Sequence, residues 1–219
     1  MKKLFFLTFL LGTLATSYAQ TSKNYIQGTL NGAEWTAEAK RMKIPVNRFR
    51  YLALAGFKVN PDESLWIRLY YFDDDLKPGT YPVVSAKGLE DAYRKNSKPT
   101  PFALVDYTSE TQKLGHAFHD GESLSGTITI TSVTDTFIEG TFEAKMTGTY
   151  YEKRALATLS GSGLRANLER KVLTSAGGGM LTTGDPHDHD NTRKSKETDS
   201  MEVVNGKFRV DWTPEENKK

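Results

Sequence analysis

The chain carries four histidines, which fall in two closely spaced pairs. His187 and His189 lie in the segment GDPHDHDN together with Asp185, and His116 and His119 lie in GHAFHD. Neutral imidazole and carboxylate are good ligands for zinc, nickel or manganese. Alternate residues of an extended segment point to the same side, so His187 and His189 could face one ion. The residue types therefore leave open a site for a divalent metal.

A solvated polar loop is the interpretation that we favour for both pairs. Pro186 and the neighbouring glycine and threonine indicate a flexible segment, whereas a tight metal site needs preorganised ligands. His116 and His119 are three residues apart, so on a regular strand they would face opposite sides. Turn-forming residues, Gly115 and Asp120-Gly121, bracket them, and we interpret this stretch as a loop. We expect no resident cofactor and at most weak binding of a divalent metal.

Motifs of the common catalytic classes are missing from the sequence. It has no cysteine, no G-x-S-x-G, no H-E-x-x-H and no phosphate-binding P-loop. We therefore expect that the protein is not an enzyme. An envelope hydrolase is kept as an alternative, which a cleft pairing two carboxylates would support.

One aromatic strand face is a second candidate site. In the segment LWIRLYYF, alternate residues Leu65, Ile67 and Leu69 fit a core. The residues between them, Trp66, Arg68 and Tyr70, line the other face. Aromatic rings on a sheet face can stack on sugars or line an apolar cavity. The alternative is a strand buried on both faces. Arginine is rarely buried without a partner, which favours a face that contacts solvent or a ligand.

The N-terminus has the order of a secretory signal peptide. Lys2 and Lys3 precede the apolar run Leu4–Leu14, and Ser17-Tyr18-Ala19 places small residues at a cleavage site. The apolar run is shorter than the ~20 residues of a membrane-spanning helix. No cysteine is present for lipoprotein anchoring. We expect a leader at residues 1–19 and one domain at residues 20–219, exported to the periplasm or medium, soluble, neither a lipoprotein nor membrane-spanning.

The charge balance argues against nucleic-acid binding. Removing Lys2 and Lys3 from the 29 basic side chains leaves 27, equal to the 27 acidic ones. A neutral chain lacks the basic patch on which proteins that bind nucleic acid depend.

Period-two alternation of apolar and polar residues predicts an all-β domain. The segments Gly126–Val133 and Phe137–Met146 alternate on either side of a short turn and predict a hairpin. Other predicted strands are Tyr25–Leu30, Glu34–Ala39, Tyr51–Val59, Leu65–Phe72, Gly79–Val84, Phe102–Ser109 and Met201–Trp212, and Leu89–Lys95 is the one predicted short helix.

Two features near the C-terminus are less regular. Ser175–Ser200 is rich in Gly, Thr, Asp, Lys and Ser, and such a segment buries too little apolar surface to offset its ordering entropy. We interpret residues 175–200 as a flexible polar insertion. Asn205-Gly206 fits either a tight turn between two strands or the interior of one continuous strand.

Several short motifs, taken in order, resemble an uncharacterised family of secreted Bacteroidota proteins whose shared domain has no assigned function. They are LNGAEWTAEA, KPGTYPV, GTITIT, EGTFEA and VVNGKFRV. The resemblance implies a compact antiparallel β-domain and no known activity. The long stretch between EGTFEA and VVNGKFRV departs from the family pattern, so the resemblance says nothing of the histidines and aspartates there.

Together these patterns predict a single antiparallel β-barrel or β-sandwich domain with one short helix and a long polar insertion. For function we expect a non-catalytic binding or envelope-associated domain. Its partner would be a small apolar molecule, a carbohydrate or an envelope protein. A metal-binding or metal-buffering role through the His/Asp-rich segment is the first alternative.

The leader predicts cleavage after Ala19, because charge, apolar run and small residues occur in the order that signal peptidase recognises. Intact-mass analysis of protein recovered from the periplasm or medium should show a chain beginning at Gln20. Recovery of an exported chain that still carries Met1 would contradict this expectation.

Overall fold

A computed structural model of the chain describes residues 23–42, 50–59, 62–71, 76–85, 100–111, 116–153 and 192–212. These residues form nine strands and no helix, as the alternation predicts. The strands are β1 (Tyr25–Leu30), β2 (Ala33–Met42), β3 (Arg50–Val59), β4 (Asp62–Tyr71), β5 (Gly79–Val83), β6 (Phe102–Glu110), β7 (His116–Val133), β8 (Phe137–Lys153) and β9 (Thr192–Asp211).

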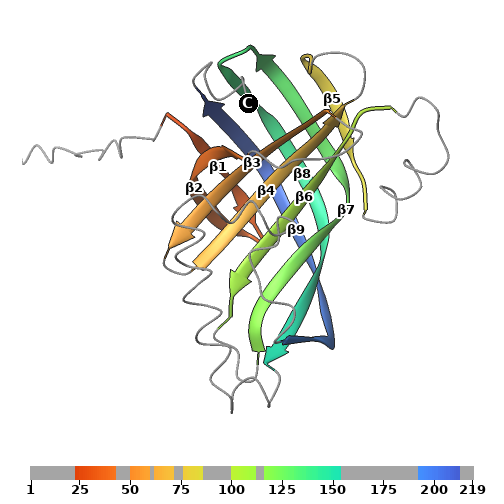
Figure 1. Ribbon diagram of the computed structural model, residues 1–219. Coiled ribbons are helices and arrows are strands. Elements are labelled where there is room, and N and C mark those ends of the chain that lie inside the picture. The colour runs from red at the N-terminus through yellow and green to blue at the C-terminus, as the bar shows by residue number, and fades with distance from the viewer. Residues whose placement is uncertain are drawn as a thin grey trace, which may run out of the picture.

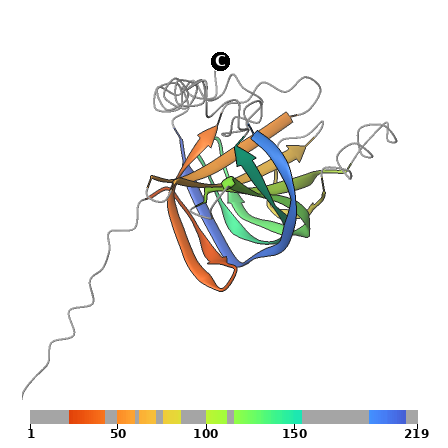
Figure 2. The ribbon, with the colours of Figure 1, turned by 90° about the horizontal axis from the view of Figure 1, so that it is seen from below.

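The strands close into a barrel in the order β1-β2-β3-β4-β6-β5-β7-β8-β9 (Figure 1). The first strand closes the ring, because β1 pairs with β2 on one side and with β9 on the other. Seen from below, the strands run round a ring in which the β1–β2 hairpin stands beside β9 (Figure 2). Closure removes the exposed strand edges that an open sheet would present.

A short strand, β5, interrupts the antiparallel order. The strands β6 and β7 pair directly only between Asp106–Glu110 and Phe118–Glu122. Further up the barrel they separate, and β5 fills the gap by pairing antiparallel with β7. Its contact with β6 is a single parallel pair, Val83 with Ala103. The sheet is therefore antiparallel except at this one point.

Alternate residues of each strand meet in one apolar core inside the barrel. Leu65, Ile67 and Leu69 of β4 are fully buried there, which confirms the core face predicted for this strand. Phe142 of β8 and Phe208 of β9 are also buried, with their ring centroids 6.3 Å apart. The core thus contains side chains from strands that are far apart in the sequence.

Three strands are longer than the sequence pattern predicts. β7 begins at His116 and not at Gly126, β8 continues to Lys153, and β9 begins at Thr192. Residues Thr192–Ser200, which were assigned to the polar insertion from the sequence, pair with β8 and belong to a strand. Their polar side chains do not prevent this, since the ladder is made by backbone groups.

Register shifts bend these long strands. One shift lies between Phe142 and Ala144 of β8. Opposite this shift, β9 runs continuously through Asn205, whose φ is 53°. The strand interpretation of Asn205-Gly206 is therefore the correct one. A β-bulge of this kind adds a residue to one strand and sharpens its twist, which lets 20-residue β9 curve around the barrel.

Several expectations lie outside the described residues. These are the leader at residues 1–19, the helix Leu89–Lys95, and residues 175–191 of the polar insertion. Within the described ranges, no helix is long and apolar enough to cross a membrane.

Replacing Phe142 by alanine should lower the free energy of unfolding by about 3–5 kcal/mol, because it removes a large side chain from the packed core. Chemical denaturation monitored by tryptophan fluorescence measures the loss. Glu143→Ala is the matched control, since Glu143 is exposed on the outer face of the same strand, and it should change stability by less than about 0.5 kcal/mol. Equal losses in both variants would contradict this assignment of inner and outer faces.

Candidate functional site

The inner face of the barrel changes from apolar to polar toward its lower end, as oriented in Figure 1. Residues paired across neighbouring strands point to the same face, so the strand register divides the interior into rows. One row is largely apolar and contains Leu54, Ile67, Val105, Ser123, Met146 and Met201. Below it comes a row with Gly56, Leu65, Tyr107, Gly121, Gly148 and Asp199.

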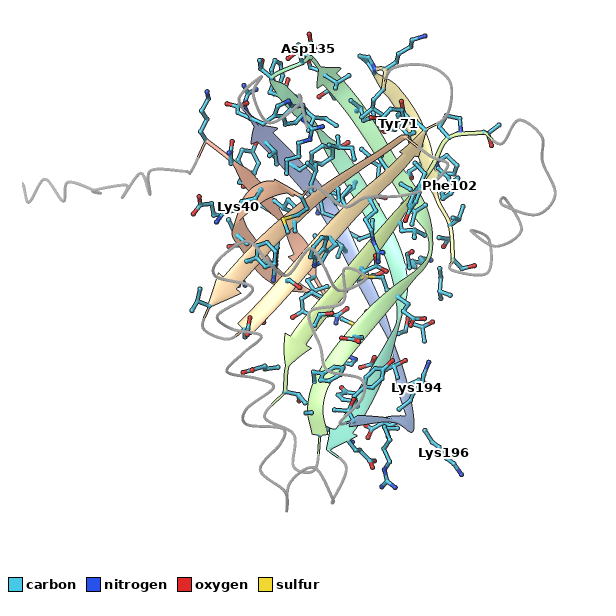
Figure 3. The ribbon with its side chains drawn as sticks, viewed as in Figure 1. Lys40, Tyr71, Phe102, Asp135, Lys194 and Lys196 are labelled. Atoms are coloured by element: carbon cyan, nitrogen blue, oxygen red, sulfur yellow. The ribbon has the colours of Figure 1, made fainter. Side chains whose placement is uncertain are left out.

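The next row down is polar throughout, and we call it the polar row. It crosses five strands and consists of Lys58, Glu63, Ser109, His119 and Tyr150. Below Glu202, which is hydrogen-bonded to Asn31, β9 extends past the end of β1. The lower parts of β6, β7, β8 and β9 therefore continue beyond the closed ring, which Figure 3 shows with Lys194 and Lys196 near their tip.

A register shift brings the two described histidines to one face. The loop interpretation of His116 and His119 is wrong, because both lie in β7. The shift between His116 and Phe118 adds one residue to the strand, so residues three apart no longer point in opposite directions. Both imidazoles stack on the ring of Tyr150, with centroids 5.0 Å away for His116 and 4.1 Å for His119.

His119 and Asp199 form a hydrogen bond that spans three strands. His119 Nε2 lies 3.0 Å from Asp199 Oδ1, although β8 separates β7 from β9. The residue between them is Gly148, and a Cβ atom there would overlap both partners. The Tyr150 hydroxyl donates to the other oxygen of Asp199 at 3.2 Å. The contact between His119 and Asp199 therefore requires glycine at position 148.

His116 lies among carboxylates and is not fully satisfied. Its side chain is only 9% exposed, and its Nε2 lies 4.0 Å from Glu152 Oε1 and 3.8 Å from Glu197 Oε2. Its Nδ1 is buried and has no hydrogen-bond partner among the described residues. Hydrogen bonds from Arg193 at 2.6 and 2.8 Å hold the pKa of Glu152 below its ordinary value. Together with the polar row, His116, Glu152, Glu197 and Asp199 form what we call the lower mouth.

The opposite side of the lower mouth is organised around Glu63. Its Oε2 accepts a 2.7 Å hydrogen bond from Trp35 Nε1 and lies 3.2 Å from Lys58 Nζ. Lys58 also lies over the Trp35 ring, 5.1 Å from its centroid. The hydroxyl of Tyr107 contacts Glu63 and Ser109, and burial raises its pKa above the ordinary value. Glu63 thereby joins the polar row to the aromatic residues beneath the core.

The lower mouth does not have the geometry of a metal site. Within the described ranges, no group of three or more His, Asp or Glu side chains is arranged to hold a metal ion. His119 faces one carboxylate, that of Asp199, at 3.0 Å, and His116 lies 4.0 and 3.8 Å from those of Glu152 and Glu197. Asp185, His187 and His189 lie outside the described residues, so a metal site in that segment stays a prediction.

A serine, a histidine and an aspartate meet at the lower mouth without forming a catalytic triad. Ser109 is the register partner of His119, which in turn contacts Asp199. A triad needs a hydrogen bond from the serine to the histidine. None joins Ser109 to His119 in the described chain, and the contact of Ser109 is with the Tyr107 hydroxyl.

The aromatic face proposed from the sequence lies on the outside of the barrel, and its side chains are engaged with neighbours. Trp66 is 8% exposed and donates from Nε1 to Ser64 Oγ at 3.3 Å. Tyr70 is 7% exposed and stacks on Phe102 at 4.8 Å. β4 is therefore buried on both faces, which was the alternative to an open ligand-facing strand.

Arg68, on the same outer face, is paired with a carboxylate of β6. It contacts Asp106 through Nη2 and also donates from Nε to Asp106 Oδ2 at 2.8 Å. Burial raises the pKa of Asp106, and the positive charge of Arg68 opposes that rise. The arginine thus has a structural partner, which explains its presence on a buried face.

Sequence reasoning singled out two residues of the lower mouth, His116 and His119, and missed the others. Gly148 and Asp199 offered no signal, because their meeting depends on the β8–β9 register. Lys58 and Glu63 lie near the junction between the predicted strands Tyr51–Val59 and Leu65–Phe72, where charged residues are ordinary. The residues buried at positions 119, 121 and 123 are His, Gly and Ser, which form no apolar alternation, so no pattern in the sequence indicates that β7 begins upstream of Gly126.

Comparison with known proteins adds no relative. No protein-family model matches the chain, and neither a curated protein nor a solved structure matches it. The lower mouth is therefore interpreted from its own geometry.

Replacing Arg68 by methionine should lower the free energy of unfolding by about 1–3 kcal/mol, because it leaves a largely buried carboxylate without its cation. The folded-state pKa of Asp106 should then rise further above its unfolded value. Stability tied to a raised pKa is present at low pH and lost as pH rises, so the deficit should shrink between pH 7 and pH 5. Denaturation midpoints at both pH values measure this.

The double variant Arg68→Met/Asp106→Leu is the control for that prediction. Replacing both members of a buried ion pair by apolar groups is often neutral or stabilising, so this variant should recover most of the loss at pH 7. A deficit in Arg68→Met that is independent of pH would show that Asp106 is not the group left unpaired.

Proposed function

We propose that the protein is an exported, non-catalytic binding domain whose ligand seats at the lower mouth of the barrel. The observation that carries this proposal is the polar row, which places ionisable and hydroxyl side chains of five strands on the inner face. The mouths of β-barrels are a frequent position for ligand sites.

Stability alone does not account for such a row. Charged groups that face a barrel interior lose hydration, and this costs free energy that apolar side chains would not. Lys58 and Glu63 are 27% and 16% exposed, and Asp199 is 41% exposed. These groups are positioned by hydrogen bonds yet remain open to solvent, which is what a site for a polar ligand requires.

The same geometry favours a polar ligand over an apolar one. Above the lower mouth the interior is occupied by packed apolar side chains such as Met146 and Met201, both at most 1% exposed. A polar solute or carbohydrate matches the hydrogen-bonding groups at the open end. The outer face at Trp66 and Tyr70 supports a ligand less well, since those rings are buried against neighbours.

Cellular location and family stay predictions from the sequence. The signal-peptide pattern at residues 1–19 supports export. The motif resemblance supports a place among secreted Bacteroidota β-proteins. An envelope protein as partner has no support beyond that resemblance.

NMR mapping tests the binding site directly. Glucose, N-acetylglucosamine and glucuronate, each added at millimolar concentration to ¹⁵N-labelled protein, give two neutral probes and one anionic probe built on the same pyranose ring. At least one should shift the amides of Gly121 and Gly148, because both lie in the row next to the polar row. Glu63→Gln should lower the affinity for that probe several-fold. The amide chemical shifts of the β7–β8 turn should not change.

Two outcomes would contradict the proposal. Shifts confined to the strand segment from Trp66 to Tyr70 would place the site on the outer face. Hydrolysis of p-nitrophenyl acetate above the buffer rate, lost in Ser109→Ala, would show that the lower mouth is catalytic.

A further inference from the structure

Two glycines separate the apolar interior of the barrel from the polar row. Gly121 of β7 and Gly148 of β8 are register partners on the inner face. Neither has a side chain, so side chains from the rows above and below can meet over them. A methyl group at Gly121 would lie 3.1 Å from Met201 Sδ and 3.3 Å from Met146 Sδ. Two thioether sulfur atoms therefore occupy the space over this glycine.

The space over Gly148 is bounded by three atoms of different elements. A methyl group there would lie 2.9 Å from Met201 Sδ and closer still to His119 Nε2 and Asp199 Oδ1. Apart from the adjoining chain, these are the three nearest heavy atoms to that point. His119 Nε2 is also 3.0 Å from Asp199 Oδ1. A nitrogen, an oxygen and a sulfur thus converge on one small volume, and each belongs to a side chain that can bind a metal ion.

The two thioethers decide which ion fits this donor set. Thioether sulfur is a soft ligand that selects Cu(I), whereas carboxylate, imidazole and water bind the harder divalent ions. Among the described residues, no group of three or more His, Asp or Glu side chains is arranged to hold a metal ion. Met146 and Met201 add the ligands that the polar side chains of the lower mouth lack by themselves.

The charge of the cluster also fits a monovalent ion. Met146 and Met201 are uncharged and at most 1% exposed, and His119 is 9% exposed. Asp199 supplies the one formal negative charge among these four side chains. A monovalent cation leaves the cluster neutral, whereas a divalent cation would leave an uncompensated charge, which is costly in a protein interior.

The hydrogen bond between His119 and Asp199 marks the position that an ion would take. In a neutral imidazole one ring nitrogen carries the proton and the other has a free lone pair. When the proton is on Nδ1, the lone pair of Nε2 points into the space shared with Asp199 Oδ1. The ion then replaces the shared proton, and the imidazole stays neutral because its proton has moved to the other nitrogen.

Ordinary packing is the alternative explanation for the two methionines, because methionine fills irregular gaps in apolar cores. Packing alone gives no reason for Met201 Sδ to lie beside an imidazole nitrogen and a carboxylate oxygen. The cluster also has a route of entry. Asp199 is 41% exposed, so an ion reaches the buried sulfur atoms by way of the lower mouth.

We infer that Met146, Met201 and His119 bind one Cu(I) ion at the inner end of the lower mouth, with Asp199 beside it as the charge partner. The inference goes beyond the proposed function, because it requires no organic ligand and uses two side chains of the apolar row. Such a site would allow the protein to sequester or transfer monovalent copper.

Methionine methyl signals test the inference directly. Protein labelled with [methyl-¹³C]methionine is titrated anaerobically with Cu(I), and the signals of Met146 and Met201 should shift. The signal of Met42 is the internal control and should not change, since Met42 packs against the separate cluster that contains Trp66. Zn²⁺ at the same concentration should leave the signals of Met146 and Met201 in place, because it disfavours thioether ligands.

Ligand-removing variants measure the contribution of each side chain. Met146→Leu and Met201→Leu nearly conserve volume, so both should fold. Each should lower the affinity for Cu(I), measured by competition with bicinchoninate, about 10–100-fold or more, because even changes beside a metal ligand cost this much. His119→Gln should act in the same direction. Met42→Leu is the matched control and should leave the affinity unchanged.

All variants are made in a His187→Ala/His189→Ala background, which removes the other candidate metal ligands. Circular dichroism confirms that each variant is folded. If a leucine variant does not fold, the methyl shifts of the background protein decide the question.

Three outcomes would overturn the inference. Copper binding that leaves the methyl signals of Met146 and Met201 unchanged would place the ion elsewhere. An equal loss of affinity in Met42→Leu and Met201→Leu would show unspecific binding. Zn²⁺ shifting the two methyl signals as strongly as Cu(I) would contradict a soft-ion site.

The copper site and the proposed binding of a polar ligand fail separately. Met146→Leu/Met201→Leu should lose Cu(I) binding but keep the sugar-induced shifts of the Gly121 and Gly148 amides. If no sugar shifts these amides while Cu(I) shifts the methionine methyl signals, the proposed function is wrong and the copper inference stands.

Discussion

β7 and β8 pair along almost their whole length, from Val133 opposite Ile138 to His116 opposite Glu152. This single antiparallel ladder fixes which side chains of both strands face inward. It places Ile128 and Phe142 together in the core and His119 and Tyr150 together at the lower mouth. A slip of one residue would exchange the inner and outer faces of a whole strand, so the apolar core and the polar row depend on the same register.

Closure by β1 and β9 turns that ladder into an interior. The pairing of Ile26 with Phe208 brings the two ends of the chain together and buries both residues. Below Asn31, which is hydrogen-bonded to Glu202, β9 has left β1. The lower mouth thus exists because the lower parts of β6, β7, β8 and β9 extend beyond the ring that β1 and β9 close.

Charged groups have two different physical roles in this barrel. Arg68 and Asp106 lie on the outer face and neutralise each other, and the raised pKa of Asp106 reflects the cost of its burial. In the lower mouth, the partners of Asp199 are an imidazole and a phenol. The first arrangement is complete within the protein, whereas Asp199 is 41% exposed at the lower end of the barrel. This contrast supports the proposal that a ligand binds at the mouth and not at the aromatic outer face.

The sequence by itself determined the features that are local along the chain. Period-two alternation identified the all-β class, the β7–β8 hairpin and the strands on either side of the β1–β2 turn. In that turn Asn31 and Gly32 have φ values of 49° and 81°, the positive values that a tight hairpin turn needs. Alternation also separated Leu65 and Ile67 from the opposite face of β4.

Only the tertiary structure decided which residues share the site. The polar row takes one residue from each of five strands, and the His119–Asp199 contact requires a glycine on the strand between them. The bulge that turns His116 to the same side as His119 exists only in the paired strand. Strand alternation depends on neighbours two residues apart and is visible in the sequence, whereas register and bulges depend on backbone hydrogen bonds between segments far apart in the chain.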